Sequence, residues 1–385
     1  MLVEKTRICS KEEDPVNLLI KGDNLKVLQD LLDMGWEERV DCVVIDPPYN
    51  TKMTFEHYSD KMVSSEWLEF MRERLLLLRK LMAKTGTLWV IIGDHECHYL
   101  KVMMDEVFGR NNFVADCVWK RMAGVHNHTK YISKTTDHIL VYAKTKANVR
   151  IRNLERTEKM DAQYKNPDND PRGPWKPDAI TAALMGSQGD SYHSKGGKSD
   201  FVYEIIAPNG EKMLPPPGRC WRYTKSRMME MMKSGRVTFT KNGKPVSKTF
   251  LSEVRDGKVV TTIWSSEEFG TNAKAKQEIL DLFEDASVFQ TPKPERLIER
   301  ILTMAGKKGD VVLDCFAGSG TTLAVAHKMQ RAYIGVEMGD HCQTLCLERL
   351  RKVIAGEQGG VSKDVGWKGG GGVKYFHHVS SPERS

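Results

Sequence analysis

Residues 311–320 read VVLDCFAGSG, which is an apolar run followed by a glycine-rich turn. The apolar part predicts a buried strand over 310–314, and the pattern after the turn predicts a helix over 321–329. Gly318 and Gly320 allow the backbone to come close to a ligand, and the helix start offers free N–H groups. This stretch therefore predicts a ligand site at the carboxyl end of a central strand in an α/β sheet.

The same alternation of strand and helix continues on both sides of this stretch. Strands are predicted over 16–21, 39–45, 87–92, 114–120, 138–144, 332–336 and 373–379. Helices are predicted over 25–32, 65–84, 96–108, 294–304 and 340–355. Strands that alternate with helices indicate a doubly wound, mostly parallel sheet with helices on both faces.

The alternation is lost in the middle of the chain. No sustained period runs over 151–275, which we interpret as an inserted small domain. Between 195 and 250, 12 lysines and arginines stand against four acidic residues, whereas the 385-residue chain carries only +7. Basic and aromatic side chains alternate there, which suits phosphate contact and base stacking but equally a small core with a charged rim. The predicted divisions are 1–150, 151–275, 276–355 and a glycine-rich tail over 356–385.

Eight cysteines are scattered along the chain, and none forms a Cys-x-x-Cys pair. The close pair Cys342 and Cys346 and the group His95, Cys97 and His98 both lack a matching second pair, so no metal site is predicted. No apolar run approaches the roughly 18 residues needed to cross a bilayer, and no signal-peptide pattern is seen. We therefore expect a cytoplasmic protein with reduced thiols and no membrane partner.

A second turn follows another apolar strand. Asp46-Pro47-Pro48-Tyr49 comes directly after 39–45, and two prolines cannot continue a central strand. Glu337 likewise ends a strand, where a carboxylate is placed to accept hydrogen bonds from a ribose diol. These residues indicate a nucleoside-containing cofactor. NAD is one candidate, but the third glycine of the dinucleotide fingerprint is missing, which disfavours a Rossmann dehydrogenase.

With DPPY at 46–49 and FAGSG at 316–320, both at strand ends, the sequence resembles the amino-methylating DNA methyltransferases. In that family the first motif acts on the exocyclic N6 of adenine and the second holds S-adenosylmethionine. The motif order resembles that of the β-ordered, circularly permuted group. Further segments resemble modification subunits of type III restriction systems: NPDNDPRGPW (166–175), GRCWR (218–222), TPKP (291–294) and GEQGG (356–360).

The resemblance implies a methyltransferase sheet of the seven-stranded type, with 151–275 as a target-recognition domain. It implies that the chain is encoded by a bacterium or a phage and acts on duplex DNA. A free-standing methyltransferase and a subunit of a restriction system are equally good alternatives. A homodimer and a restriction subunit are the candidate protein partners.

For catalysis, the resemblance assigns Asp46, Pro47, Pro48 and Tyr49. The adenine amino group is a weak nucleophile whose nitrogen gains positive charge in the transition state. The Asp46 carboxylate and the Pro47 carbonyl would accept its two N–H bonds, which favours that state. The two prolines stiffen the loop, and Tyr49 offers a stacking face for a base that must be flipped out of the duplex.

The resemblance also implies a set of binding residues. In the cofactor pocket, Asp314 would bind the amino acid end, Glu337 the ribose and Asp23 the adenine, with the remaining lining from Phe316, Ala317, Gly318, Gly320 and Lys293. The basic residues expected to contact DNA are Lys120, Arg121, Arg219, Arg222, Lys225 and Arg227. Asp94 either shapes the base pocket or, as we favour, caps the next helix. His126 and His128 are weak candidates for DNA contact.

The predicted reaction is methylation of adenine N6 in duplex DNA. Methylation of cytosine N4 uses the same chemistry, usually with serine in place of Asp46, and is the nearest alternative. Methylation of adenine in RNA or of a protein glutamine is a further alternative, against which the large basic insertion favours duplex DNA. Methylation of cytosine C5 needs a cysteine, usually after proline, and the chain has no Pro-Cys pair. A catalytically silent DNA-binding subunit is disfavoured by the two intact motifs.

Overall fold

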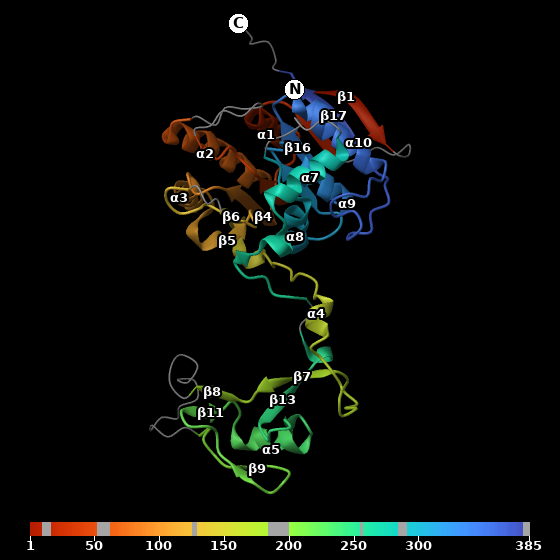
Figure 1. The fold of residues 1–385 in the computed structure, drawn as a ribbon. Coiled ribbons are helices and arrows are strands. Elements are labelled where there is room, and N and C mark those ends of the chain that lie inside the picture. Colours follow the sequence, from red (N-terminus) through yellow and green to blue (C-terminus); the bar gives the residue numbers. More distant parts are fainter. Residues whose placement is uncertain are drawn as a thin grey trace. The chain divides into compact units, whose positions relative to one another are not determined.

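The computed structural model describes residues 1–9, 17–51, 62–124, 129–183, 200–254, 257–283 and 291–379. The chain forms two compact units, of which the first joins Met1–Leu154 to Val259–Ser385 and the second is Glu155–Lys258 (Figure 1). The inserted unit therefore ends earlier than the predicted 275. The reason is that β14 (Ile263–Trp264) pairs in parallel with β5 (Phe113–Lys120) and so belongs to the first unit.

One ten-stranded sheet organises the first unit, in the order β1-β17-β2-β16-β15-β3-β4-β6-β5-β14. Besides β5 and β14, its strands are β1 (Leu2–Cys9), β2 (Leu18–Lys21), β3 (Val40–Ile45), β4 (Met82–Ile92), β6 (Thr136–Ala143), β15 (Val311–Asp314), β16 (Ala332–Glu337) and β17 (Gly372–His378). Within it, β1 and β6 run antiparallel to their neighbours, and the remaining pairings are parallel. In sheet order, the seven strands β2-β16-β15-β3-β4-β6-β5 form the expected methyltransferase-type sheet, so the predicted fold class is confirmed.

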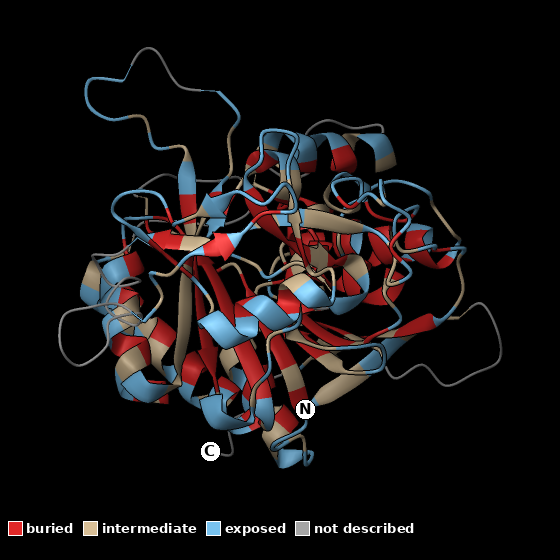
Figure 2. Cartoon of the chain, turned by 90° about the horizontal axis from the view of Figure 1, so that it is seen from below, coloured by how far each residue is buried: buried red, intermediate tan, exposed pale blue. Residues whose placement is uncertain are grey.

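Helices cover both faces of this sheet. One layer contains α1 (Asn24–Asp33), α2 (Ser64–Leu81) and α3 (Cys97–Phe108), and the other contains α8 (Glu295–Ala305), α9 (Thr321–Lys328) and α10 (Glu348–Ile354). In β3, Cys42 and Val44 pack toward the second layer, whereas Val43 and Ile45 pack toward the first. A strand buried on both faces needs apolar residues in succession, which explains its pattern. Figure 2 shows the buried residues gathered in the strands and the exposed residues on the outer sides of helices.

The glycine-rich C-terminal segment is largely part of the fold and not a tail, and β17 confirms the strand predicted over 373–379. β17 lies between β1 and β2, and Val361 and Trp367 are buried. A Cβ added at Gly360 would lie 1.9 Å from an oxygen of the buried Glu295, which also accepts a hydrogen bond from the Val361 N–H at 3.0 Å. Gly360 therefore allows the backbone to approach a buried charge closely. From composition alone, the glycines of this segment had suggested a flexible loop.

A second difference concerns residues 340–355, which were predicted as one helix. A π-helical turn, η5 (Cys342–Leu347), precedes α10 and places Cys346 beside the glycine turn at 318–320. π-turns are frequent at functional sites. Among the described residues, no helix is both long and apolar enough to cross a membrane.

The second unit is built from short elements, which explains why no sequence period was visible. Its three-stranded sheet has the order β12 (Val237–Phe239), β13 (Pro245–Phe250) and β7 (Trp175–Ala179). Two smaller pairs join β11 (Arg219–Trp221) to β8 (Thr181–Ala183) and β10 (Lys212–Met213) to β9 (Ile205–Ile206), and the described helices include α4 (Glu158–Asp161) and α5 (Lys225–Lys233). Trp221 is buried in a small core with Met228 and Ile205, so this aromatic residue is not a surface for base stacking.

Candidate active site

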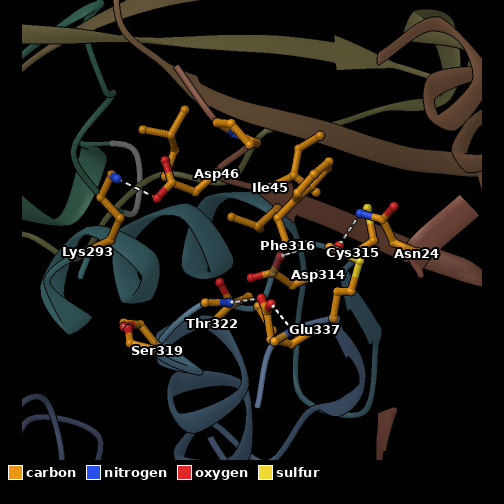
Figure 3. A pocket seen from close by; sticks show the side chains of 18 of the residues that line it. Asn24, Ile45, Asp46, Lys293, Asp314, Cys315, Phe316, Ser319, Thr322 and Glu337 are labelled. Atoms are coloured by element: carbon orange, nitrogen blue, oxygen red, sulfur yellow. Dashed lines mark hydrogen bonds and ion pairs between the residues drawn. The ribbon is translucent and has the colours of Figure 1, made fainter. Parts of the chain in front are cut away.

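The carboxyl ends of four neighbouring parallel strands meet at one edge of the sheet, where open α/β sheets bind ligands. A cavity of about 520 Å³ lies there. Its lining includes Asp23 after β2, Asp46 after β3, Gly318 after β15 and Glu337 at the end of β16, and Lys293 closes it from the segment before α8 (Figure 3). The structure thus brings the two sequence motifs, 270 residues apart, into one cavity.

The glycine turn is held by its own backbone N–H groups. The N–H of Phe316 donates to Oδ1 of Asp314 at 3.0 Å, and the N–H of Gly318 donates to Oε2 of Glu337 at 2.9 Å. Gly318 has a φ of 51°, in the left-handed region that glycine adopts at little cost. Ala317 also lines the cavity. Gly320 does not; a Cβ added there would lie 3.3 Å from Cys346 Cα, so it serves the packing of the turn.

The two acids beside the glycine turn, Asp314 and Glu337, have pKa values that are shifted in opposite directions. Burial raises the pKa of Asp314 to about 7, and the neighbouring Asp46 and Glu337 carboxylates add to the rise. Burial opposes ionisation of Glu337 too, but hydrogen bonds from His341 and from the N–H groups of Gly339 and Gly318 bring its pKa below the usual value. Glu337 therefore enters the site as a carboxylate, whereas Asp314 is poised to change its charge near neutral pH.

The predicted Asp23 lies in the cavity beside two residues that the sequence analysis did not single out, Asn24 and Arg74. Asp23 caps α1 by accepting the N–H of Leu25 at 2.8 Å. Asn24 donates to the carbonyl of Cys315 at 2.7 Å, and its Oδ1 accepts from Arg74 Nε at 2.6 Å. Arg74 comes from α2 and is brought here by tertiary packing, so no local sequence pattern marked it.

Aromatic rings form a wall next to this network. The Arg74 guanidinium lies 3.5 Å from the centroid of the Phe70 ring, and the centroids of the Phe70 and Phe316 rings are 6.0 Å apart. All three line the cavity. The predicted Phe316 therefore has a partner ring, and together they offer an apolar surface of the kind that contacts a nucleobase.

Of the Asp-Pro-Pro-Tyr loop, Asp46 and Pro48 line the cavity, whereas Pro47 is buried and, like Tyr49, lies outside the lining. Lys293 Nζ donates to Oδ2 of Asp46 at 2.5 Å, whereas the buried Oδ1 has no hydrogen-bond partner among the described residues. Burial raises the pKa of Asp46, and Lys293 opposes the rise. Trp67 Nε1 donates to the Pro48 carbonyl at 2.8 Å, but no described residue donates to the carbonyl of Pro47. One oxygen of Asp46, at the cavity wall, and the Pro47 carbonyl, outside the lining, are thus both unpaired among the described residues.

Tyr49 is held in place from two sides. Its hydroxyl donates to Oδ2 of Asp137 at 3.1 Å, and Asp137 in turn pairs with Arg121 at 3.0 Å. A Cβ added at Gly93 would lie 2.7 Å from the Tyr49 ring, so this glycine makes room for it. Asp137 lies in β6 and is buried, and the sequence analysis did not single it out because its pattern is that of an ordinary strand residue.

The predicted DNA contacts lie on both units. In the first unit, Lys120 is exposed and Arg121 is tied to Asp137. In the second unit, Arg219 donates to Thr181 at 2.9 Å and Arg227 to Glu230 at 2.7 Å. The other two, Arg222 and Lys225, are exposed on the same unit.

The remaining candidates have other roles or cannot be placed. Asp94 pairs with Lys134 at 3.0 Å and does not cap α3, whose first turn has no side-chain cap, so the favoured interpretation was wrong. His126 and His128 lie outside the described residues. All eight cysteines are free, and within the described ranges no group of three histidine, cysteine or acidic residues could hold a metal ion.

The sequence of the chain matches a known family and several known proteins. The sequence model of the N6/N4 DNA methylases matches residues 40–347. The chain is 36% identical to the Mod subunit of the type III restriction-modification enzyme StyLTI of Salmonella typhimurium, over 80% of this chain and 49% of that protein. It is 32% identical to the type II methyltransferase M.EcaI of Enterobacter cloacae (83% and 66% covered) and 30% identical to M.KpnI of Klebsiella pneumoniae (79% and 75% covered).

The chain spans about half the length of the type III subunits that it matches. The family match, in contrast, covers both sequence motifs and the insertion between them. The chain therefore belongs to the N6/N4 DNA methylase family, whose members take the methyl group from S-adenosylmethionine.

Proposed function

We propose that this chain methylates the exocyclic N6 of an adenine that is flipped out of duplex DNA. The observation that carries the proposal is that Asp46, with a buried oxygen lacking a partner among the described residues, faces the same cavity as the Gly318 turn and Glu337. One cavity therefore holds acceptors suited to an amino group and acceptors suited to a nucleoside cofactor.

The cavity residues fit S-adenosylmethionine. Glu337 keeps a lone pair on Oε2 for a ribose hydroxyl, because that oxygen accepts the Gly318 N–H alone among the described donors, whereas Oε1 accepts from both Gly339 and His341. The Phe70 and Phe316 rings supply an apolar wall for the adenine, with Asp23 at its edge. Asp314 is placed to accept the ammonium group of the amino acid end. When bound, the cofactor supplies an electrophilic methyl group on a sulfonium, and no metal is required.

The protein's contribution to the reaction is alignment and charge. The amino nitrogen would attack the methyl carbon as the carbon–sulfur bond breaks with its electron pair on sulfur, and the nitrogen would then release one proton to give the neutral methylated base. The Oδ1 of Asp46 and the Pro47 carbonyl accept the two N–H bonds as positive charge develops on nitrogen. Tyr49, fixed by Asp137 and Gly93, offers its ring face to the extruded base.

Adenine is the base we favour, for two reasons. Asp46 stands where enzymes that act on cytosine N4 usually have serine, and several similar proteins are Mod subunits of type III restriction-modification enzymes. Cytosine N4 is the alternative because its amino group has the same two donors.

For DNA binding, we propose Lys120 and Arg121 on the first unit and Arg219, Arg222, Lys225 and Arg227 on the second, with the second unit as the target-recognition domain. Phosphate contacts from such residues supply much of the affinity for DNA. A restriction subunit is the protein partner we propose from the type III relatives, and a homodimer is the alternative.

The test is to incubate purified protein with duplex DNA and S-adenosylmethionine and to identify modified nucleosides by mass spectrometry. Long-read mapping of modified bases would then give the position and sequence context. We expect N6-methyladenine in one short motif. N4-methylcytosine would refute the choice of base, and the absence of any modified base would refute the proposed function.

A further inference from the structure

Lys293 sits among the groups that the reaction needs. It comes from the TPKP segment before α8, it is only 9% exposed, and both it and Asp46 line the cavity. Its Nζ lies 2.5 Å from Oδ2 of Asp46 and 5.2 Å from the centroid of the Tyr49 ring (Figure 3). An ammonium group is therefore the direct counter-ion of the acid in the Asp-Pro-Pro-Tyr motif.

This arrangement conflicts with the proposed reaction. The ammonium of Lys293 offsets the negative charge of Asp46, which would otherwise stabilise the positive charge developing on the amino nitrogen. It also occupies one of the two carboxylate oxygens. In addition, the sulfonium of the cofactor has to approach the same point, and two cations there repel each other in a site shielded from water.

The cofactor itself carries a group that resolves the conflict, namely the carboxylate of its amino acid end. Resting on the proposed function, we propose that Lys293 exchanges partners: it pairs with Asp46 in the free pocket and with the carboxylate of bound S-adenosylmethionine. The exchange moves the ammonium away from Asp46, so that the negative charge of the carboxylate is no longer offset when its Oδ1 accepts the adenine amino group. Lys293 keeps its proton throughout, so no bond other than hydrogen bonds changes.

The surroundings of Asp46 support such an exchange. The other titratable groups that face it are Tyr49, Asp137 from β6 and Asp314 from β15. These are acids, and the nearby cation Arg121 is already paired with Asp137. Among these groups Lys293 is therefore the cation that neutralises Asp46, and it remains in the same cavity when it pairs with the cofactor carboxylate.

The exchange couples cofactor binding to base acceptance, which can be measured without catalysis. The DNA is a labelled duplex whose target adenine keeps its N6 amino group and is mismatched, so that it flips readily, and fluorescence anisotropy reports its binding. The probes are S-adenosylhomocysteine, which has the carboxylate, and 5′-methylthioadenosine, which lacks the amino acid end. At saturation we expect the first probe to tighten binding of the flipped DNA by a factor between about 5 and 150, the usual range of such couplings. The second should leave it unchanged.

In Lys293→Met the two probes should act alike, whereas Lys308→Met, which changes an exposed lysine, should keep the wild-type difference. The pH dependence of single-turnover methylation gives a second readout. Without its counter-ion the pKa of Asp46 rises further, so the rate of Lys293→Met should recover only at higher pH, and Lys293→Arg should partly restore the wild-type profile.

Equal effects of the two probes on the wild-type protein would overturn the exchange, as would a full effect of S-adenosylhomocysteine on Lys293→Met. If Lys293→Met does not fold, the wild-type comparison decides alone. A wild-type protein that methylates DNA but treats both probes alike overturns only this inference. One that forms no methylated base overturns the proposed function instead.

Discussion

The N–H of Gly318 donates to Oε2 of Glu337 at 2.9 Å, which ties the turn after β15 to the acid that ends β16. The other oxygen of Glu337 accepts the N–H of Gly339 at 3.0 Å. Both backbone donors fix the carboxylate before any ligand arrives. Because His341 also bonds to the oxygen that accepts from Gly339, the free lone pair is on Oε2, which is preorganised to accept a ribose hydroxyl.

Glu337→Gln should weaken the binding of S-adenosylhomocysteine by about 1.5–3 kcal/mol, the usual contribution of a hydrogen bond to a charged group. The amide has only one acceptor oxygen, and its NH₂ would face a backbone N–H. Isothermal titration calorimetry measures the effect. Glu69→Gln, which alters an exposed residue of α2, is the control. Equal affinities of Glu337→Gln and wild type would remove Glu337 from the cofactor site.

The affinity for S-adenosylhomocysteine should depend on pH through Asp314. Its pKa is about 7, and the proposed bond to the ligand ammonium requires the ionised form. Below pH 7 a proton must therefore be lost on binding, so the affinity should rise as the pH passes upward through about 7 and then level off. Asp314→Asn cannot ionise and should show a flat profile. An equally steep profile in that variant would place the titrating group elsewhere.

Tyr49→Phe and Tyr49→Ala should differ in single-turnover methylation rate. The phenylalanine variant keeps the ring and loses only the bond to Asp137, which stays paired with Arg121, so a loss of no more than about tenfold is expected. The alanine variant also loses base stacking, which contributes about 1–3 kcal/mol per base. If both variants lost the same activity, the hydroxyl and not the ring would be the important group.

Gly335→Ala should lower the free energy of unfolding by about 1–3 kcal/mol, the usual cost of overpacking a core. A Cβ at this position of β16 would lie 2.3 Å from Cδ1 of Leu323, which is fully buried and cannot move aside freely. Urea unfolding measures the change. Gly124→Ala, where no atom lies within 4 Å of the added Cβ, should leave stability unchanged. An unaffected Gly335→Ala would mean that the α9 layer is loosely packed.

The parts of the fold that could be predicted were those with strong local signals. β3 and β15 are buried on both faces, so their apolar runs were visible, and the residues that follow them marked the ligand edge of the sheet. Asp46 and Gly318 could therefore be placed in one site from the sequence alone. This placement follows because parallel strands have their carboxyl ends at the same edge of the sheet.

The parts that were missed depend on contacts between distant segments. Arg74 reaches the cavity from α2 and Asp137 reaches Tyr49 from β6, and each fits the ordinary pattern of its own element. Lys293 was expected at the cofactor pocket, but its sequence context also fits a surface lysine and did not show that it is buried against Asp46. The ordered segment with Gly360 was missed because composition cannot show that a glycine is chosen for close approach to a buried charge such as Glu295.

The central claim is that Asp46 accepts the amino group that is methylated in the cavity of the Gly318 turn. The most direct test measures DNA methylation and S-adenosylhomocysteine affinity together in Asp46→Asn, with Asp281→Asn on the surface of α7 (Asn272–Leu282) as the control. We predict that Asp46→Asn loses a factor of about 100 or more in rate, as when one preorganised group is removed from a charge-stabilising site. We also predict that its cofactor affinity does not fall. Methylation at the wild-type rate by Asp46→Asn would contradict the account.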